Sequence, residues 1–414
     1  MLSSRLRLAA LLAVLPALAG CGSVVSAQET TGNQLTVYSS LPLQGPSAPI
    51  ARQIEGGEKL ALSQAGGHAG PFKVSYVSLG DVNPVNGQPS PGESSAAAAQ
   101  AAKDTSTIAF LGDYGSEATA ISLPITNEAG ILQVSPFSPY VGLTSSEYAG
   151  QDEPQRFYLS GKRNFTRLAP GDQAQAEAQA RLMRSLGLSS VYVLDDQGPF
   201  ESPLANLVAK DAAKEGVKVV GHDSVGLAAE ANYAGELEKI LASHAQGVFL
   251  AAGAGPGAVN LWQRLHAASP RLVLLGSNSL ANDSFTAELG AAGAVTYLTT
   301  PLLGESLYPP SARRVLTEYT RTFHSEAGPW VLYGYEAMDG VLDAIRRAGP
   351  LGNNRPDVIR SYFATRDRDS VIGRYSVMPN GETTLSTYGV DVVKAGRPVF
   401  SRAIDTGSPA GPAG

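Results

Sequence analysis

A glycine-rich turn at residues 253–257 has the residue types that could cradle a phosphate. Its sequence, GAGPG, follows an apolar run and opens a segment of helical period. The spacing is not that of the dinucleotide fingerprint, and the next apolar run ends in Gly276-Ser277 without an acidic residue for a ribose. We therefore interpret the turn as a tight connection between a strand and a helix, and we predict no cofactor.

Other motifs of catalysis and metal binding are missing from the sequence. No G-x-x-x-x-G-K-[ST] and no G-x-S-x-G occurs, and the five histidines form no H-E-x-x-H and no close pair. A single cysteine excludes an intrachain disulfide and a cysteine cage for a metal. We predict that the protein is not an enzyme and has no catalytic residues and no metal site. A secreted hydrolase stays open as an alternative, because catalytic triads assemble in space.

The single cysteine, Cys21, ends a segment typical of export. Arg5 and Arg7 precede an apolar stretch that is too short to span a bilayer, which needs about 20 residues. The letters LAGC at 18–21 then resemble a bacterial lipobox. We predict a signal peptide at 1–20 and a lipid on Cys21 that anchors the protein to a membrane.

Composition and charge indicate a folded protein with short polar segments at both ends. Residues 21–34 are small and polar and predict a tether, and residues 406–414 predict a disordered tail. Hydrophobic residues make up 43%, enough for a core, and 37 acidic against 31 basic residues give a net charge of -6. That balance disfavours nucleic-acid binding. We expect an exported protein at the outer face of the cytoplasmic membrane, or on the periplasmic side of a bacterial envelope.

The body of the chain alternates apolar runs of strand length with segments of helical period, twice over. This pattern predicts an α/β fold with two lobes, each a mostly parallel sheet flanked by helices. Ligands of such sheets bind outside the carboxyl ends of the strands. The predicted strands are 35–41, 72–79, 107–113, 131–136, 190–196, 217–222, 247–252, 271–277, 294–301, 374–378 and 387–393. The predicted helices are 51–67, 94–104, 116–130, 172–186, 201–215, 232–243, 257–268, 310–326 and 331–348.

Five segments in this order resemble a known family. The chain is similar to the extracytoplasmic solute-binding lipoproteins of ABC transporters, with the type I periplasmic binding protein fold, in the group named for branched-chain amino acids. The resemblance covers roughly residues 35–400. It is carried by LPLQGP (41–46), FLGDYGSEATAISLPITNEAGILQVSP (110–136), YVGLT (140–144), YGYEAMDGVLDAI (333–345) and GRYSVMPNGE (373–382).

The resemblance implies a division of the chain and a set of partners. Residues 35–166 plus 301–376 would form lobe 1, and residues 167–300 plus 377–405 lobe 2. Three hinge strands would cross between them near 166–169, 299–301 and 377–381. The lobes would close on a small ligand, and a membrane permease of an ABC transporter would accept the closed form. A monomer is expected. A lipid-anchored sensing protein that is not coupled to transport is the alternative.

The resemblance also implies the ligand contacts. Ser116, at a helix N-terminus, would receive a carboxylate or carbonyl group, because free N–H groups and the helix dipole suit an anion there. The alternative is that Ser116 is the N-cap of the helix. The family's usual Thr appears as Pro139, and its usual ammonium-pairing Glu as Asn278. The full set of expected contacts is Tyr114, Gly115, Ser116, Phe137, Ser138, Phe200 and Asn278.

These departures bear on the ligand. Loss of two usual partners disfavours tight general binding of leucine, isoleucine and valine, since a buried unpaired charge is costly. Glu117 or Glu201 could replace the ammonium partner from neighbouring loops. We expect an amino acid or amino-acid-like ligand with a carboxylate or carbonyl group and an apolar or aromatic body; an aromatic acid or an amide also fits.

Overall fold

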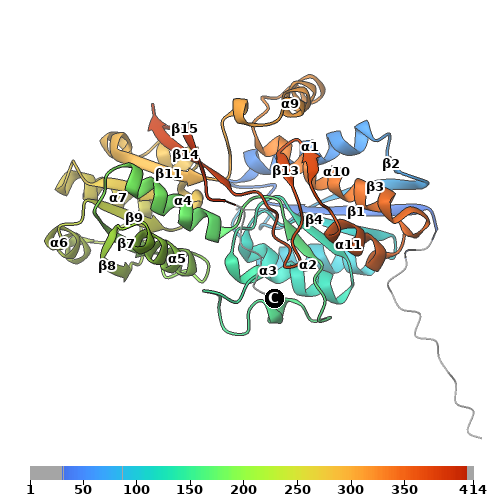
Figure 1. The fold of residues 1–414 in the computed structure, drawn as a ribbon, viewed down its shortest axis with the longest axis horizontal. Coiled ribbons are helices and arrows are strands. Elements are labelled where there is room, and N and C mark those ends of the chain that lie inside the picture. The colour runs from blue at the N-terminus through green and yellow to red at the C-terminus, as the bar shows by residue number, and fades with distance from the viewer. Residues whose placement is uncertain (1–29, 31, 86, 408–414) are drawn as a thin grey trace, which may run out of the picture.

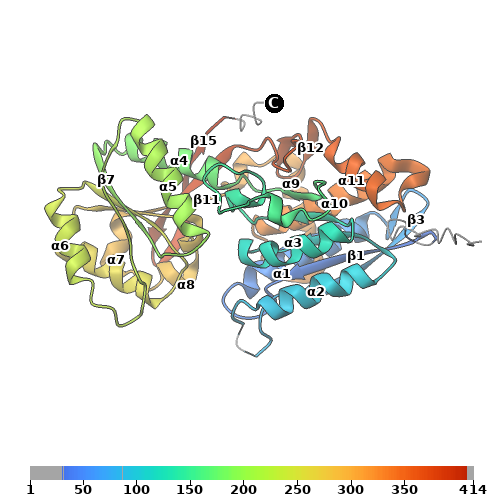
Figure 2. The same ribbon diagram turned by 90° about the horizontal axis from the view of Figure 1, so that it is seen from below.

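The computed structural model describes residues 30, 32–85 and 87–407, and they form two lobes side by side (Figure 1). Each lobe contains one large sheet with helices packed around it, and the lobes lie next to each other along the longest axis (Figure 2). The predicted two-lobed α/β fold with mostly parallel sheets is confirmed. The predicted signal peptide, Cys21, most of the tether and residues 408–414 lie outside the described residues.

The sheet of lobe 1 has six strands in the order β2-β3-β1-β4-β5-β6. Neighbouring strands are parallel except for β2 and β3. Every residue of β4 is buried, since helices cover both faces, and its sequence is accordingly a nearly unbroken apolar run. The strands are β1 (Gln34–Leu41), β2 (His68–Ala69), β3 (Phe72–Gly80), β4 (Thr107–Gly112), β5 (Leu132–Ser135) and β6 (Phe165–Arg167).

The sheet of lobe 2 has seven strands in the order β15-β14-β11-β10-β9-β7-β8. The strands from β7 to β11 pair in parallel, whereas β14 is antiparallel to both of its neighbours. A separate two-stranded hairpin joins β12 and β13. The strands are β7 (Ser190–Asp195), β8 (Lys218–Ser224), β9 (Gly247–Ala251), β10 (Val273–Gly276), β11 (Thr296–Thr300), β12 (Arg368–Ser370), β13 (Gly373–Tyr375), β14 (Thr387–Lys394) and β15 (Arg397–Asp405).

The long helix α10 packs closely against α1 in lobe 1. A Cβ atom at Gly57 would lie 2.1 Å from the carbonyl oxygen of Val331, and one at Gly334 would lie 2.0 Å from that of Ile54. Glycine at both positions therefore lets the two helix backbones approach. The helices are α1 (Ala48–Gln64), α2 (Pro91–Lys103), α3 (Ser116–Glu128), α4 (Asp172–Ser185), α5 (Glu201–Lys214), α6 (Ala234–Ala242), α7 (Pro256–Ala268), α8 (Asp283–Thr286), α9 (Pro310–Phe323), α10 (Trp330–Ala348) and α11 (Arg355–Phe363).

The chain passes between the lobes three times: from β6 to α4, from β11 to α9, and from β13 to β14. The first and third passages touch. The Arg167 N–H donates to the carbonyl oxygen of Gly381 at 3.2 Å, and the Thr383 hydroxyl donates to that of Leu168 at 3.2 Å. These two passages are therefore joined by hydrogen bonds.

Five helices and strands have no counterpart in the sequence prediction: α8, α11, β2, the hairpin strand β12, and β15; β6 was expected only as a hinge strand near 166–169. Along β15 the burial alternates, and Pro398 lies in this edge strand, so no continuous apolar run marks it. The strand predicted at 374–378 is shorter and ends at Tyr375.

The folded body also begins before the end of the predicted tether. Thr30 is buried, and its N–H and hydroxyl both donate to the carbonyl oxygen of Asn353, at 3.0 and 2.8 Å. Within the described residues, no helix is long and apolar enough to cross a membrane.

Candidate functional site

Helix α3 starts just after the carboxyl end of β4, and its first residue is Ser116. Gly115 occupies the N-cap position and no side chain caps the helix, so Ser116 does not have the capping role that the sequence left open. The Ser116 hydroxyl oxygen instead accepts a hydrogen bond from the Tyr140 N–H at 3.2 Å. Its own hydrogen, together with the N–H groups of the first turn, suits an oxygen of a ligand.

The turn after β5 carries Phe137 and Ser138 and is bonded into lobe 1. The Ser138 hydroxyl lies 2.6 Å from the Thr119 hydroxyl and donates to the carbonyl oxygen of Asp113 at 2.9 Å. Its N–H donates to the carbonyl oxygen of Tyr114 at 3.1 Å. The structure thus uses the polar groups of Ser138 to hold the turn against the start of α3.

Tyr114 and Phe137 form an aromatic cluster with Trp330, the first residue of α10. The ring centroids lie 5.3 Å apart for Tyr114 with Phe137, 5.3 Å for Tyr114 with Trp330, and 5.5 Å for Phe137 with Trp330. Burial raises the pKa of Tyr114. Trp330 was not among the residues predicted to form the site. Its position just before the family segment YGYE (333–336) was the available signal.

Phe200 brings lobe 2 into contact with this edge of lobe 1. Its ring packs edge-on against Tyr140 with centroids 4.9 Å apart. Because Tyr140 is also the partner of Ser116, these three residues form a continuous chain from one lobe to the other. A hollow of about 450 Å³ lies alongside, lined by Glu117, Ala120, Ile121, Pro124, Arg156, Phe157 and Phe200.

Asn278 follows β10 at the carboxyl edge of the lobe 2 sheet. Its Nδ2 atom is buried and has no hydrogen-bond partner within the described residues, while its Oδ1 accepts from the Ser279 hydroxyl at 3.3 Å. The neighbouring Ser277 hydroxyl is buried and also lacks a partner there. Buried donors without acceptors are costly, so both groups are candidates for ligand contacts. Among the residues that the structure describes, no hydrogen bond joins Asn278 to Ser116.

Carboxyl groups from both lobes gather next to Ser116 and Phe200. Asp196, after β7, accepts from the N–H groups of Gly198 and Gly253 at 2.9 and 3.0 Å. Burial, followed by the charges of Asp196, Glu117 and Asp172, raises the pKa of Glu201 to about 8. Loss of solvent and the Asp196 charge also raise the pKa of Glu117, although that residue remains exposed.

Asp81 and Asp113, which directly follow β3 and β4, form a buried pair of carboxyl groups. Burial and then the charge of Asp113 raise the pKa of Asp81 to about 8, and burial raises the pKa of Asp113 to about 6. One oxygen of each carboxyl group, Oδ1, has no hydrogen-bond partner within the described residues. Mutual repulsion and burial therefore favour a shared proton on this pair near neutral pH.

The polar groups at the start of α3 are arranged so that they can bind an oxygen of a ligand. The Ser116 hydroxyl accepts from a backbone N–H instead of pairing with a base, so nothing in this contact activates it. The structure brings Tyr114, Gly115, Ser116 and Phe137 together at one edge of lobe 1, and Phe200 packs against Tyr140, the partner of Ser116. Within the residues that the structure describes, no group of three or more histidine, cysteine or acidic residues is placed to hold a metal ion.

Comparison with known proteins identifies the fold. The profile described as "Periplasmic binding protein" matches residues 39–397. The chain belongs to the periplasmic binding protein family. This binding protein is 22% identical over 352 residues to an amino acid binding protein of Pseudomonas aeruginosa, covering 84% of this chain and 87% of that protein.

Two solved structures show the same architecture at low identity. The first is a leucine binding protein from Thermotoga maritima, with a TM-score of 0.74 and 19% identity over 90% of this chain and 99% of that one. The second is an ABC transporter solute binding protein of R. palustris in complex with 4-hydroxybenzoate, with a TM-score of 0.73 and 16% identity over 91% and 98%. The resemblance inferred from the sequence is confirmed by these matches.

Proposed function

We propose that this binding protein is the extracytoplasmic solute-binding component of an ABC importer. The observation that carries the proposal is the contact chain from Ser116 through Tyr140 to Phe200, which joins a helix N-terminus of lobe 1 to lobe 2. A ligand at this edge would lie between two bodies that are connected by three passages. Closure of the lobes would remove water from it and strengthen its hydrogen bonds.

The polar groups of the site favour a ligand with both a carboxylate or carbonyl group and a positive charge. Ser116 and the first turn of α3 would receive the oxygen, as would the unpartnered amide of Asn278. Glu201, with Glu117 nearby, would pair with an ammonium group, because four carboxyl groups repel one another there in the empty protein. Phe137 and Phe200 would contact an apolar or aromatic body. An aromatic amino acid meets all of these requirements, whereas an acid without an ammonium group would add a further negative charge.

The remaining parts of the proposal concern location and partners. Cys21 would carry lipid after removal of residues 1–20, and the segment 21–34 would connect it to the folded body. Residues 35–166 with 301–376, and 167–300 with 377–405, would be the two lobes that an ABC permease recognises when they are closed. The protein would act as a monomer and without turnover of its ligand.

Four compounds with one phenyl body test the ligand class: L-phenylalanine, 3-phenylpropionate, phenethylamine and phenylpyruvate. They differ in whether an ammonium and a carboxylate group are present. A ligand at 100 times its dissociation constant stabilises the folded state by about 2.7 kcal/mol, which a thermal-shift assay detects. We expect the largest shift with L-phenylalanine. Equal shifts with 3-phenylpropionate would contradict the ammonium site. A shift with leucine or valine but with none of the four phenyl compounds would contradict the proposed ligand class, as would no shift with any of these compounds.

A further inference from the structure

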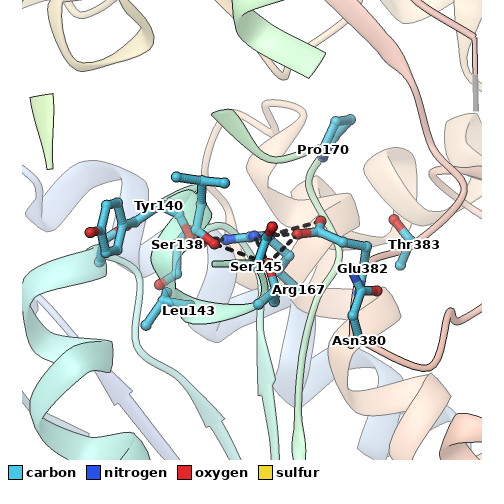
Figure 3. Close-up of polar contacts among 12 residues, drawn as sticks. Ser138, Tyr140, Leu143, Ser145, Arg167, Pro170, Asn380, Glu382 and Thr383 are labelled. Atoms are coloured by element: carbon cyan, nitrogen blue, oxygen red, sulfur yellow. Dashed lines mark hydrogen bonds and ion pairs between the residues drawn. The ribbon is translucent and has the colours of Figure 1, made fainter. Parts of the chain in front are cut away.

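Arg167 lies fully buried at the first passage, beside the turn that carries Phe137 and Ser138 (Figure 3). It is the last residue of β6. Its Nη1 atom donates to two carbonyl oxygens of the turn, that of Ser138 at 2.6 Å and that of Tyr140 at 2.8 Å. The guanidinium group therefore contacts both the residue after Phe137 and the residue that bonds Ser116.

The other donors of Arg167 reach the third passage and the end of the same turn. Nε donates to Glu382 Oε2 at 2.9 Å, and Nη2 bonds Glu382 Oε1. Nη2 also donates to the Thr144 hydroxyl at 2.6 Å, and that hydroxyl donates in turn to Glu382 Oε1. All five N–H groups of the guanidinium are thus used.

The ion pair between Arg167 and Glu382 does not by itself require the hydrogen bonds from Arg167 to the turn. Two of the five hydrogen bonds would neutralise the charge of Arg167 against Glu382, and the other three go to the turn. The carbonyl oxygen of Pro139 accepts a further bond, from the Asp172 N–H at 2.9 Å. Three consecutive carbonyl groups of the turn are therefore held by residues of the first passage and the start of α4.

The conformation of the turn explains why it needs this support. Ser138 has a φ of +36°, in a region that residues other than glycine rarely adopt. Such a conformation persists where the surrounding structure fixes it. The hydrogen bonds from Arg167 to the carbonyl oxygens of Ser138 and Tyr140 contribute that constraint.

We propose that Arg167, with Glu382 as its counter-ion, is a positioning residue that holds the turn 138–144 and thereby presents Ser116 and Phe137 to the ligand. The consequence for ligand affinity rests on the proposed function, whereas the effect on the turn does not. Because Glu382 lies on the third passage, the same contacts couple the turn to the segments between the lobes.

Arg167→Lys is the decisive variant. Lysine keeps a positive charge facing Glu382 but lacks the planar fork of donors that reaches the turn. Hydrogen exchange followed by mass spectrometry measures the amides of Ser138, Tyr140 and Thr144, which are hydrogen-bonded in the native turn. Exchange in this peptide should become at least about 10-fold faster, as expected for loss of hydrogen bonds to a charged group.

The fluorescence emission of Trp330, whose ring packs against Phe137, is a second measure of the conformation of the turn. With Trp262→Phe as background, Trp330 is the remaining tryptophan of the chain, so its emission reports on the turn. Arg167→Lys should shift this emission without any ligand present. Unchanged emission together with unchanged exchange would overturn the proposal.

Arg368→Lys provides a matched control in the same lobe. Arg368 is also largely buried and pairs with Glu336 and Asp339, each at 2.6 Å. Among the described residues, none of its hydrogen bonds and ion pairs reaches the turn. This variant should lower the melting temperature without faster exchange in the turn. If both variants affected the turn equally at equal loss of stability, Arg167 would have only a structural role.

Titration with L-phenylalanine tests the consequence for binding. Arg167→Lys should weaken affinity about 10-fold, and Arg368→Lys should leave it unchanged. If the wild-type protein does not bind L-phenylalanine, the proposed aromatic amino acid ligand fails, and the exchange measurement still decides the role of Arg167. If Arg167→Lys does not fold, Thr144→Val removes one bond to the guanidinium and should produce a smaller acceleration of exchange; an unchanged rate there would overturn the proposal.

Discussion

The raised pKa of Glu201 makes ligand affinity depend on pH with a sign that reveals the charge of the ligand. Burial and three neighbouring carboxyl groups, Asp196, Glu117 and Asp172, raise the pKa of this carboxyl group to about 8. In the empty protein Glu201 is therefore mostly protonated at neutral pH. An ammonium group binds to the ionised form, so binding must release a proton, and affinity must rise with pH below the pKa.

The size of the effect follows from the ionised fraction. With a pKa of about 8, the ionised fraction of Glu201 increases from about 0.3% at pH 5.5 to about 9% at pH 7, so affinity should rise about 30-fold. Isothermal titration of L-phenylalanine across this range measures the slope. The same titration in two buffers of different ionisation enthalpy counts the protons released, which should approach one per ligand.

Glu201→Gln is the control, because glutamine imitates the protonated carboxyl group. Its affinity should already be below that of the wild type at pH 5.5 and stay nearly constant, so the gap between the two should widen by about 30-fold up to pH 7. Asp81, Asp113 and Asp172 also titrate with raised pKa values, so a slope that survives in Glu201→Gln would assign the proton to one of them. Affinity that falls with rising pH would refute the reasoning, since it would indicate a protonated carboxyl group donating to an anionic ligand.

Four further predictions concern single contacts and the whole particle. Ser116→Ala should weaken ligand binding by about 10- to 150-fold in a titration with L-phenylalanine, the range for one hydrogen bond to a charged group, and unchanged affinity would exclude the contact. Cys21→Ser should lose partitioning into detergent; retention there with residues 1–20 still attached would contradict lipid attachment. The radius of gyration from small-angle scattering should decrease when a saturating ligand closes the lobes, and an unchanged value would argue against closure. Burial raises the pKa of Glu58 to about 8, above the ordinary pKa of a glutamate. The free energy of unfolding should therefore fall by up to about 1.4 kcal/mol per pH unit as pH rises from the ordinary pKa to the raised one. Glu58→Gln should remove this slope from denaturant titrations, and an unchanged slope would assign the titration to another group.

The architecture could be predicted from the sequence wherever one strand or helix carries its own signal. The run TIAFLG became β4, buried throughout, and the predicted helix 201–215 differs from α5 by one residue. Signals of this kind are local, because burial on both faces of a parallel strand requires apolar residues along its whole length. The edge strand β15 has no such requirement, so it was missed.

The supports of the site could not be predicted, because their partners are distant in the chain. Arg167 and Glu382 are 215 positions apart, and Trp330 meets Phe137 only after the second passage returns the chain to lobe 1. The hydroxyl of Ser116 was expected either to cap α3 or to contact a ligand. Its observed partner, the Tyr140 N–H, belongs to a turn whose course depends on Arg167.

The carboxyl groups around the site show how the fold gives ordinary residues an unusual chemistry. In the sequence, Asp81, Asp113, Asp172 and Glu201 are separate acids at or just beyond the ends of four predicted elements, and acidic residues are usually solvated. The fold places each at the end of a strand or the start of a helix, where burial raises its pKa. The buried guanidinium of Arg167 is bonded to Glu382, and among the described residues no ion pair reaches these four carboxyl groups, although the charge of Arg167 partly offsets the effect of burial on the pKa of Asp172. Protons compensate for this in the empty protein, and a bound cation would displace them. The affinity for a cationic ligand and the number of protons released on binding should therefore both depend on the uncompensated negative charge of these carboxyl groups.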